Sequence, residues 1–132
     1  MAFVNRCLEF LAPKGKLAIV LPDGVLANSS MQDVRDWILR WARLKAVISL
    51  PQATFAPYGA GVKTSIVVLK KRERALPADG QLELGQEVVE ADEDYEVYMA
   101  RIDDIGYDAR GLATNVDETE DIVTNFTKLV RL

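Results

Sequence analysis

The chain has 132 residues, enough for one globular domain that buries roughly two thirds of its unfolded surface. Apolar residues make up 49% and charged residues 27%, and no apolar run approaches the ~20 residues that a membrane helix needs. The sequence has no histidine and one cysteine, Cys7. This composition excludes a Ser-His-Asp triad, an internal disulfide and a Cys/His zinc site, and it favours a cytoplasmic location.

The net charge of −4 hides an uneven distribution along the chain. Residues 1–74 carry a net charge of +7, and residues 75–132 carry −11. A basic first half can lie near phosphates. The alternative is that both halves are solvated faces of one domain, or that the acidic part covers a basic partner.

The first half predicts alternating helices and strands. An apolar stripe over 3–11 predicts a helix, which Pro13 and Gly15 end. The run 16–22 is typical of a strand buried on both faces. A helix is expected to follow it, with Ser30 as a candidate cap and its tryptophans packed against the sheet, and 45–51 is expected to form a second buried strand.

A loop over 52–62 separates this second strand from a third, which spans 63–71 and ends in basic residues. Since no helix lies between the second and third strands, they can pair antiparallel. Beyond them, 75–94 is expected to be an acidic linker or surface loop. The remainder predicts a strand at 95–102, a turn-rich loop and a terminal helix whose charges complement its dipole.

The glycine-containing stretch TFAPYGAGVKTSIVVLKK, residues 54–71, leaves several interpretations open. A phosphate-binding P-loop would need Gly-Lys-Thr leading into a helix, whereas here Val62 intervenes and a strand follows. Gly59 and Gly61 can simply supply positive φ angles in a tight turn. Alternatively, the loop can present Phe55 and Tyr58 to a flat ligand beyond a strand end.

The stretch LAPKGKLAIVLPDGVLANSSMQDVRDWILRWARLKAVISLPQATFAPYGAGVKTSIVVLKK resembles the later part of the catalytic domain of adenine-N6 DNA methyltransferases. The similarity is to the modification subunit of type I restriction-modification systems, and it extends to YMARIDDIGYDARG. The resemblance implies an α/β fold, namely a partial Rossmann-like methyltransferase sheet with flanking helices. In that sheet 16–22, 45–50 and 64–70 would be the fifth, sixth and seventh strands, and the seventh would be antiparallel.

The resemblance also implies a set of site residues. In the family, an aromatic side chain in the loop before the last strand packs on the flipped adenine, and Phe55 matches it best. Tyr58, Lys63 and Thr64 are further candidates for the same wall, and Pro22-Asp23-Gly24 would face the same cleft unless it is only a local turn. The candidates for contact with the DNA backbone are Lys70, Lys71 and Arg72.

The sequence departs from the family pattern in its reactive half. It contains neither the catalytic Asn-Pro-Pro-aromatic motif nor the glycine-rich motif for S-adenosylmethionine. We therefore expect residues 1–74 to be the later half of a methyltransferase core, and 95–132 to be an extension of it. No bound cofactor and no methyl transfer are expected for this chain alone.

Several partners and one alternative function follow from this interpretation. The complete system would involve DNA and separate specificity and restriction subunits, and no membrane. The open edge of the fifth strand is expected either to self-associate or to be covered by the strand at 95–102. The alternative is a non-catalytic module in which a basic rim (70–74) and an acidic stretch (79–96) bind a protein or nucleic acid.

Overall fold

The computed structural model describes residues 2–76 and 95–130. The helices are α1 (Ala2–Phe10), α2 (Asp23–Ala27), α3 (Gln32–Trp41) and α4 (Thr119–Leu129), with 3-10 turns η1 (Ser29–Met31) and η2 (Gln52–Tyr58). The strands are β1 (Lys16–Pro22), β2 (Ala42–Ser49), β3 (Thr64–Lys71), β4 (Tyr98–Arg101), β5 (Ile105–Tyr107) and β6 (Ala113–Asp117). In this part of the chain no helix is both long and apolar enough to cross a membrane.

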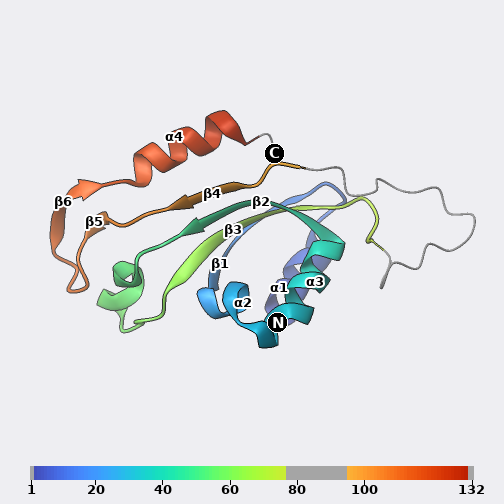
Figure 1. Cartoon of the computed structure of the whole chain (residues 1–132), viewed down its shortest axis with the longest axis horizontal. Helices are drawn as coiled ribbons and strands as arrows, with labels where there is room; N and C mark the ends of the chain where they lie inside the picture. Colours follow the sequence, from blue (N-terminus) through green and yellow to red (C-terminus); the bar gives the residue numbers. More distant parts are fainter. Residues whose placement is uncertain (1, 77–94, 131–132) are drawn as a thin grey trace, which may run out of the picture.

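Strands β1 to β4 form one mixed sheet in the order β1-β3-β2-β4 (Figure 1). Strand β3 is antiparallel to both of its neighbours, with Ile19 opposite Val67 and Val47 opposite Val67. Strand β4 is parallel to β2. The predicted antiparallel pairing of the second and third strands is confirmed, and the sheet is α/β and mixed, with one strand more than the three expected.

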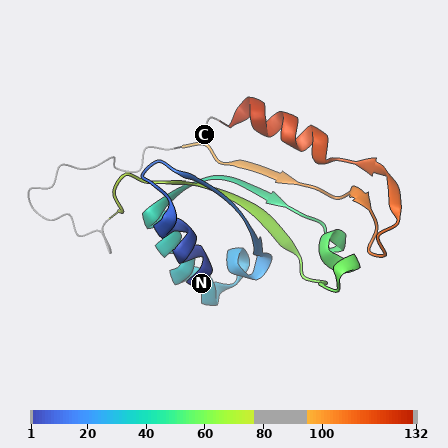
Figure 2. The same cartoon turned by 180° about the vertical axis from the view of Figure 1, so that it is seen from behind.

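Helices α1, α2 and α3 cover one face of the sheet, and α4 lies over the other (Figures 1 and 2). The larger core lies between the sheet and helices α1 and α3. Alternate residues of β1 and β3 pack there against side chains of the two helices. Its buried members include Val4, Leu8, Ile19, Leu21, Ile38, Val67 and Leu69. Trp37 packs against this core, as expected for a tryptophan beside a sheet. Trp41, 6.2 Å from Trp37 between ring centroids, is partly exposed.

The second core lies between the sheet and α4. Its buried residues are Ile48, Leu50 and Ile102, and Phe55, Ile66, Tyr98 and Ile122 pack around them. Tyr98 of β4 meets Phe126 of α4 edge-on, with ring centroids 5.7 Å apart, a geometry that aromatic pairs favour. Acidic residues in the first turn of α4 and Lys128 in its last turn confirm the predicted match to the helix dipole.

Three sequence-based expectations were wrong. Ser30 caps no helix, because it lies inside η1, and α3 begins after Met31 without a side-chain cap. The segment after β4 contains the antiparallel hairpin β5–β6. Strand β4 does not cover the open edge of β1, because it pairs with β2 on the opposite side of the sheet.

Most of the predicted acidic linker, from residue 77 to 94, lies outside the described residues.

Candidate functional site

One edge of the sheet gathers most of the residues singled out in the sequence. Strands β1 and β2 are both antiparallel to β3, so their carboxyl ends lie at the same edge as the start of β3. Strand β4, parallel to β2, ends there too. In α/β proteins, ligands bind beyond the carboxyl ends of parallel strands. The loops at this edge are therefore the candidate site.

Asp23, the first residue of α2, joins the end of β1 to the segment that precedes β3. Its backbone N–H donates to the carbonyl of Lys63 at 3.0 Å, and its Oδ1 accepts a hydrogen bond of 2.8 Å from Ser65 Oγ. The Lys63 Nζ lies 3.8 Å from the other carboxylate oxygen. The predicted Pro22-Asp23-Gly24 turn is instead the last residue of β1 followed by the first two residues of α2. The structure brings this junction against Lys63 and Thr64, and Asp23 ties them together.

Thr64 is opposite Pro22 in the sheet and only 8% exposed. Its carbonyl accepts a hydrogen bond from the Leu50 backbone N–H at 2.9 Å. Its hydroxyl oxygen is buried, and no described residue provides it with a hydrogen-bond partner. A buried hydroxyl of this kind is costly, and it does not face solvent where a ligand would reach it.

The aromatic loop (residues 52–62, containing η2) presents its two rings differently. Phe55 is half-buried and packs against the second core, whereas Tyr58 is 82% exposed. Gly59 ends η2 in the left-handed conformation with φ of 83°, which confirms one of the two predicted glycine roles. Gly61 does not have a positive φ, so that prediction was wrong for Gly61.

The aromatic loop is closed by hydrogen bonds of its own. The Ala60 backbone N–H donates to the Phe55 carbonyl at 3.1 Å, and Gln52 Nε2 donates to the Gly61 carbonyl at 2.9 Å. The strand β3 follows directly, so the amides after Lys63 enter a sheet ladder. This excludes a P-loop, which would need a helix at that position.

Lys70, Lys71 and Arg72 lie at the other end of β3, about 20 Å from Thr64 at ~3.3 Å per residue. Lys71 Nζ donates to the Leu11 carbonyl at 2.6 Å, and Arg72 Nε donates to the Leu39 carbonyl at 3.1 Å. Basic side chains commonly bind carbonyls near helix ends in this way. The structure therefore does not bring these three residues together with the aromatic loop.

The hairpin β5–β6 also lies at this edge, where the sequence predicted only a turn-rich loop. Tyr107 Oη donates to the carbonyl of Thr54 at 2.9 Å, which joins the hairpin to the aromatic loop. At the hairpin tip, the backbone amides of Leu112 and Arg110 donate to Asp108 and lower the pKa of its carboxyl. An Asp followed three residues later by Gly111 is a type I turn signature, so the sequence did carry a signal for this tip.

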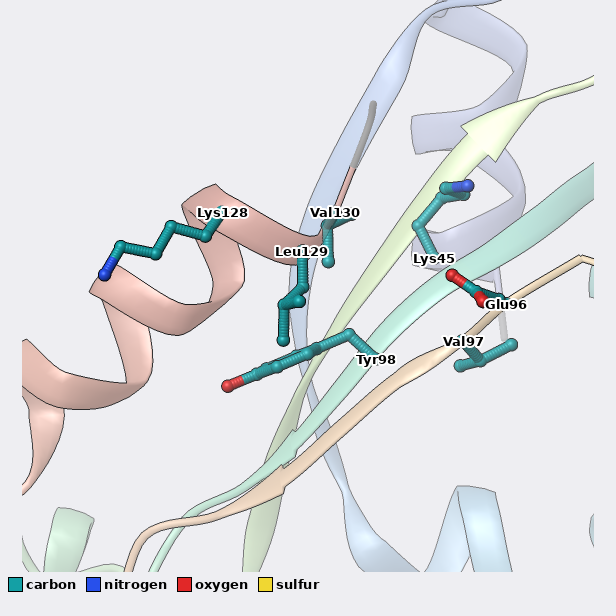
Figure 3. A pocket seen from close by; sticks show the side chains of 7 residues that line it. All are labelled: Lys45, Glu96, Val97, Tyr98, Lys128, Leu129 and Val130. Atoms are coloured by element: carbon teal, nitrogen blue, oxygen red, sulfur yellow. The ribbon is translucent and has the colours of Figure 1, made fainter.

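A separate cavity of about 780 Å³ lies between the end of α4 and the strands β2 and β4 (Figure 3). Its lining residues are Lys45, Glu96, Val97, Tyr98, Lys128, Leu129 and Val130. In Figure 3 the two lysine side chains point away from one another, so they do not converge on a common ligand. No group of three or more potential metal ligands occurs among residues 2–76 and 95–130.

Comparison with known proteins places these features in a family. A family model described as N-6 DNA Methylase matches residues 1–103. The methylase subunit of the type I restriction enzyme EcoEI from Escherichia coli is 34% identical over 70 residues, which cover 52% of this chain and 14% of that protein. The EcoKI methylase subunit of E. coli K12 is 32% identical over 78 residues, covering 58% of this chain and 14% of the relative.

A solved structure shares the fold. It is a Listeria monocytogenes protein described as a class I S-adenosylmethionine-dependent methyltransferase, with a TM-score of 0.59 and 19% identity, covering 96% of this chain and 31% of the other. The chain therefore spans a small part of the relatives that it matches. Because the family model covers more than half of the sequence, the chain belongs to the N-6 DNA methylase family.

Proposed function

We propose that this chain forms one wall of the target-adenine pocket in an adenine-N6 DNA methyltransferase of the type I modification-subunit kind. The observation that carries the proposal is the aromatic loop at the carboxyl edge of the sheet, which exposes Tyr58 beside a half-buried Phe55. A base taken out of the duplex loses its stacking, and an aromatic side chain replaces it; stacking of this kind contributes about 1–3 kcal/mol per base.

The other residues of the edge would hold this wall in place. Asp23 ties the junction of β1 and α2 to Lys63, which keeps the glycine-containing segment next to the strand end. Pro22 and Gly24 flank Asp23 in that junction. Thr64 holds the start of β3 beside Leu50, just after β2, through its backbone carbonyl.

Lys70, Lys71 and Arg72 would contact DNA away from the target base. The distance of about 20 Å from Thr64 corresponds to roughly six base pairs along a duplex. Phosphate contacts there would be sequence-independent and sensitive to salt. They would add affinity for flanking DNA without choosing the base.

The methyl donor implied by the family is S-adenosylmethionine. This sequence lacks the family's glycine-rich donor motif and its Asn-Pro-Pro-aromatic motif. The donor site and the catalytic asparagine would belong to other parts of the complete enzyme.

The relatives are methylase subunits of type I restriction enzymes. By analogy, the complete protein would act on DNA together with specificity and restriction subunits. The choice of DNA sequence would then belong to the specificity subunit rather than to this chain.

Base stacking can be tested with a single-stranded oligonucleotide that contains 2-aminopurine, whose fluorescence falls when it stacks. Wild-type chain is expected to quench it, and Phe55→Ala and Tyr58→Ala to weaken binding about fivefold or more, since each removes one stacking surface. Phe10→Ala removes another exposed ring, on α1, and serves as the control. If Phe10→Ala has the same effect as the loop variants, or if the wild-type chain causes no quenching, the base-wall assignment is wrong.

Methyl transfer by this chain alone is expected to be absent, because it carries no Asn-Pro-Pro-aromatic motif. Incubation with labelled S-adenosylmethionine and adenine-containing DNA measures this directly. Incorporation of label above the level of a protein-free control would contradict the proposal that the reactive half lies elsewhere.

A further inference from the structure

The hairpin β5–β6 lies outside the four-stranded sheet, yet it packs against the aromatic loop (Figure 1). Tyr107 Oη donates a hydrogen bond of 2.9 Å to the carbonyl of Thr54, which precedes Phe55 in the chain. Ile105 packs in the same apolar cluster as Phe55. The hairpin therefore contacts the loop through the Tyr107 hydroxyl and shares a core with it through Ile105.

A second contact is made at the hairpin tip. Gly111 has a φ of +80°, and a Cβ built there would lie 3.5 Å from the Cβ of Pro57. Pro57 directly precedes Tyr58. The hairpin tip thus lies against the C-terminal end of η2. Tyr107 binds η2 nearer its N-terminal end, at Thr54.

The hairpin is itself well braced, so it can act as a rigid support. Asp104 Oδ1 accepts hydrogen bonds from the Gly106 backbone N–H at 2.9 Å and from Thr114 Oγ1 at 2.6 Å. Glu118 Oε2 accepts one from the Asp103 backbone N–H at 2.7 Å. These bonds fix the hairpin at its base on both strands.

We propose that Tyr107 is a positioning residue, through which the hairpin β5–β6 holds the aromatic loop in the orientation that presents Phe55 and Tyr58. This inference rests on the proposed function for its purpose, because the loop is the proposed base wall. The brace itself rests only on the contacts described above. Tyr107 does not touch the base and acts through the Thr54 carbonyl.

The brace can be tested by hydrogen–deuterium exchange on the whole chain. Three backbone amides of the loop report on it: Thr54, Gly59 and Ala60, each of which donates to a carbonyl within or just before η2. In Tyr107→Phe these amides are expected to exchange about two- to tenfold faster, the factor that corresponds to one net hydrogen bond. Gly111→Ala strains the tip and is expected to accelerate the same amides independently of Tyr107.

Tyr98→Phe is the matched control, since it removes a tyrosine hydroxyl that lies 3.4 Å from the carbonyl of Ile122, a residue of α4 and not of the aromatic loop. It is expected to leave exchange in the aromatic loop unchanged. Exchange in Tyr107→Phe equal to that of the wild type would overturn the proposal, and so would equal acceleration by Tyr98→Phe.

Binding of the 2-aminopurine oligonucleotide separates the brace from the proposed function. Affinity is expected to fall two- to tenfold in Tyr107→Phe and to stay unchanged in Tyr98→Phe. If the wild type does not bind the oligonucleotide while Tyr107→Phe still loosens the loop, the brace stands and the base-wall function fails. If the wild type binds and Tyr107→Phe leaves loop exchange unchanged, the function stands and the brace fails.

Discussion

Gly59 and Gly61 are two residues apart, yet their backbones have different requirements. Gly59 ends η2 at a φ of +83°, where an L side chain is strained by roughly 1–2 kcal/mol. Gly61 has no positive φ, and a Cβ built there would meet no atom within 4 Å. We predict that Gly59→Ala lowers the free energy of unfolding by about 1–2 kcal/mol, whereas Gly61→Ala leaves it unchanged or raises it by less than ~1 kcal/mol.

Urea unfolding of both variants measures this difference, with Gly61→Ala as the internal control. The sequence alone suggested the same role for both glycines, because either can adopt a positive φ. Their difference arises from the way η2 ends, which local composition does not reveal. Equal destabilisation by the two variants would contradict the assignment.

Asp108 organises the hairpin tip through its charged form. The backbone amides of Leu112 and Arg110, together with the Arg110 side chain, hold the pKa of this carboxyl below its ordinary value of 3.8. Folding therefore favours the carboxylate, so its contribution to stability is present above pH 3.8 and is lost as the pH falls through the lowered pKa. We predict that the amide resonances of Arg110 and Leu112 titrate with a midpoint below 3.8.

An NMR pH titration of those two amides gives the midpoint, and Asp108→Asn should remove the transition. A midpoint above 3.8 in the wild type, or an unchanged transition in Asp108→Asn, would show that another group controls the tip.

At the scale of elements, the sequence was informative where apolar residues run without interruption. The run 16–22 predicted β1 at its observed bounds, and the lack of a helix before β3 predicted its antiparallel pairing. Strand β2 begins three residues earlier than predicted, at Ala42, because β3 extends far enough to pair with it through Lys71. This extension depends on the partner strand, so the composition of 42–44 alone does not show it.

The hairpin β5–β6 was missed for a related reason. Its strands are only three and five residues long, and Gly106 and Gly111 dominate the local pattern as turn signals. What holds the hairpin is side-chain bonding from Asp104 and Glu118 together with packing on the aromatic loop. The sequence was enough to predict the aromatic residues of the candidate site. It did not show that the hairpin holds the aromatic loop, because Tyr107 and Thr54 are 53 positions apart in the chain.

The two sides of the four-stranded sheet, where its outer strands β4 and β1 lie, are very different. On one side β4 covers β2 through parallel pairing. On the other side, β1 has no strand partner beyond β3 among the described residues. Its Val20 side chain is 47% exposed, in a strand that the family resemblance places within a larger sheet. An uncovered apolar edge strand is a template for pairing with another chain.

We predict that the chain self-associates through β1, so that its apparent mass in size-exclusion chromatography with light scattering rises with concentration. Val20→Lys places a charge on this strand and should shift the chain towards the monomer, as lysines do on natural edge strands. Val123→Lys, on the exposed side of α4 where the side chain is 60% exposed, is the matched control and should leave the mass unchanged. A monomer at every concentration would rule out association through β1, and equal effects of the two lysines would place the contact elsewhere.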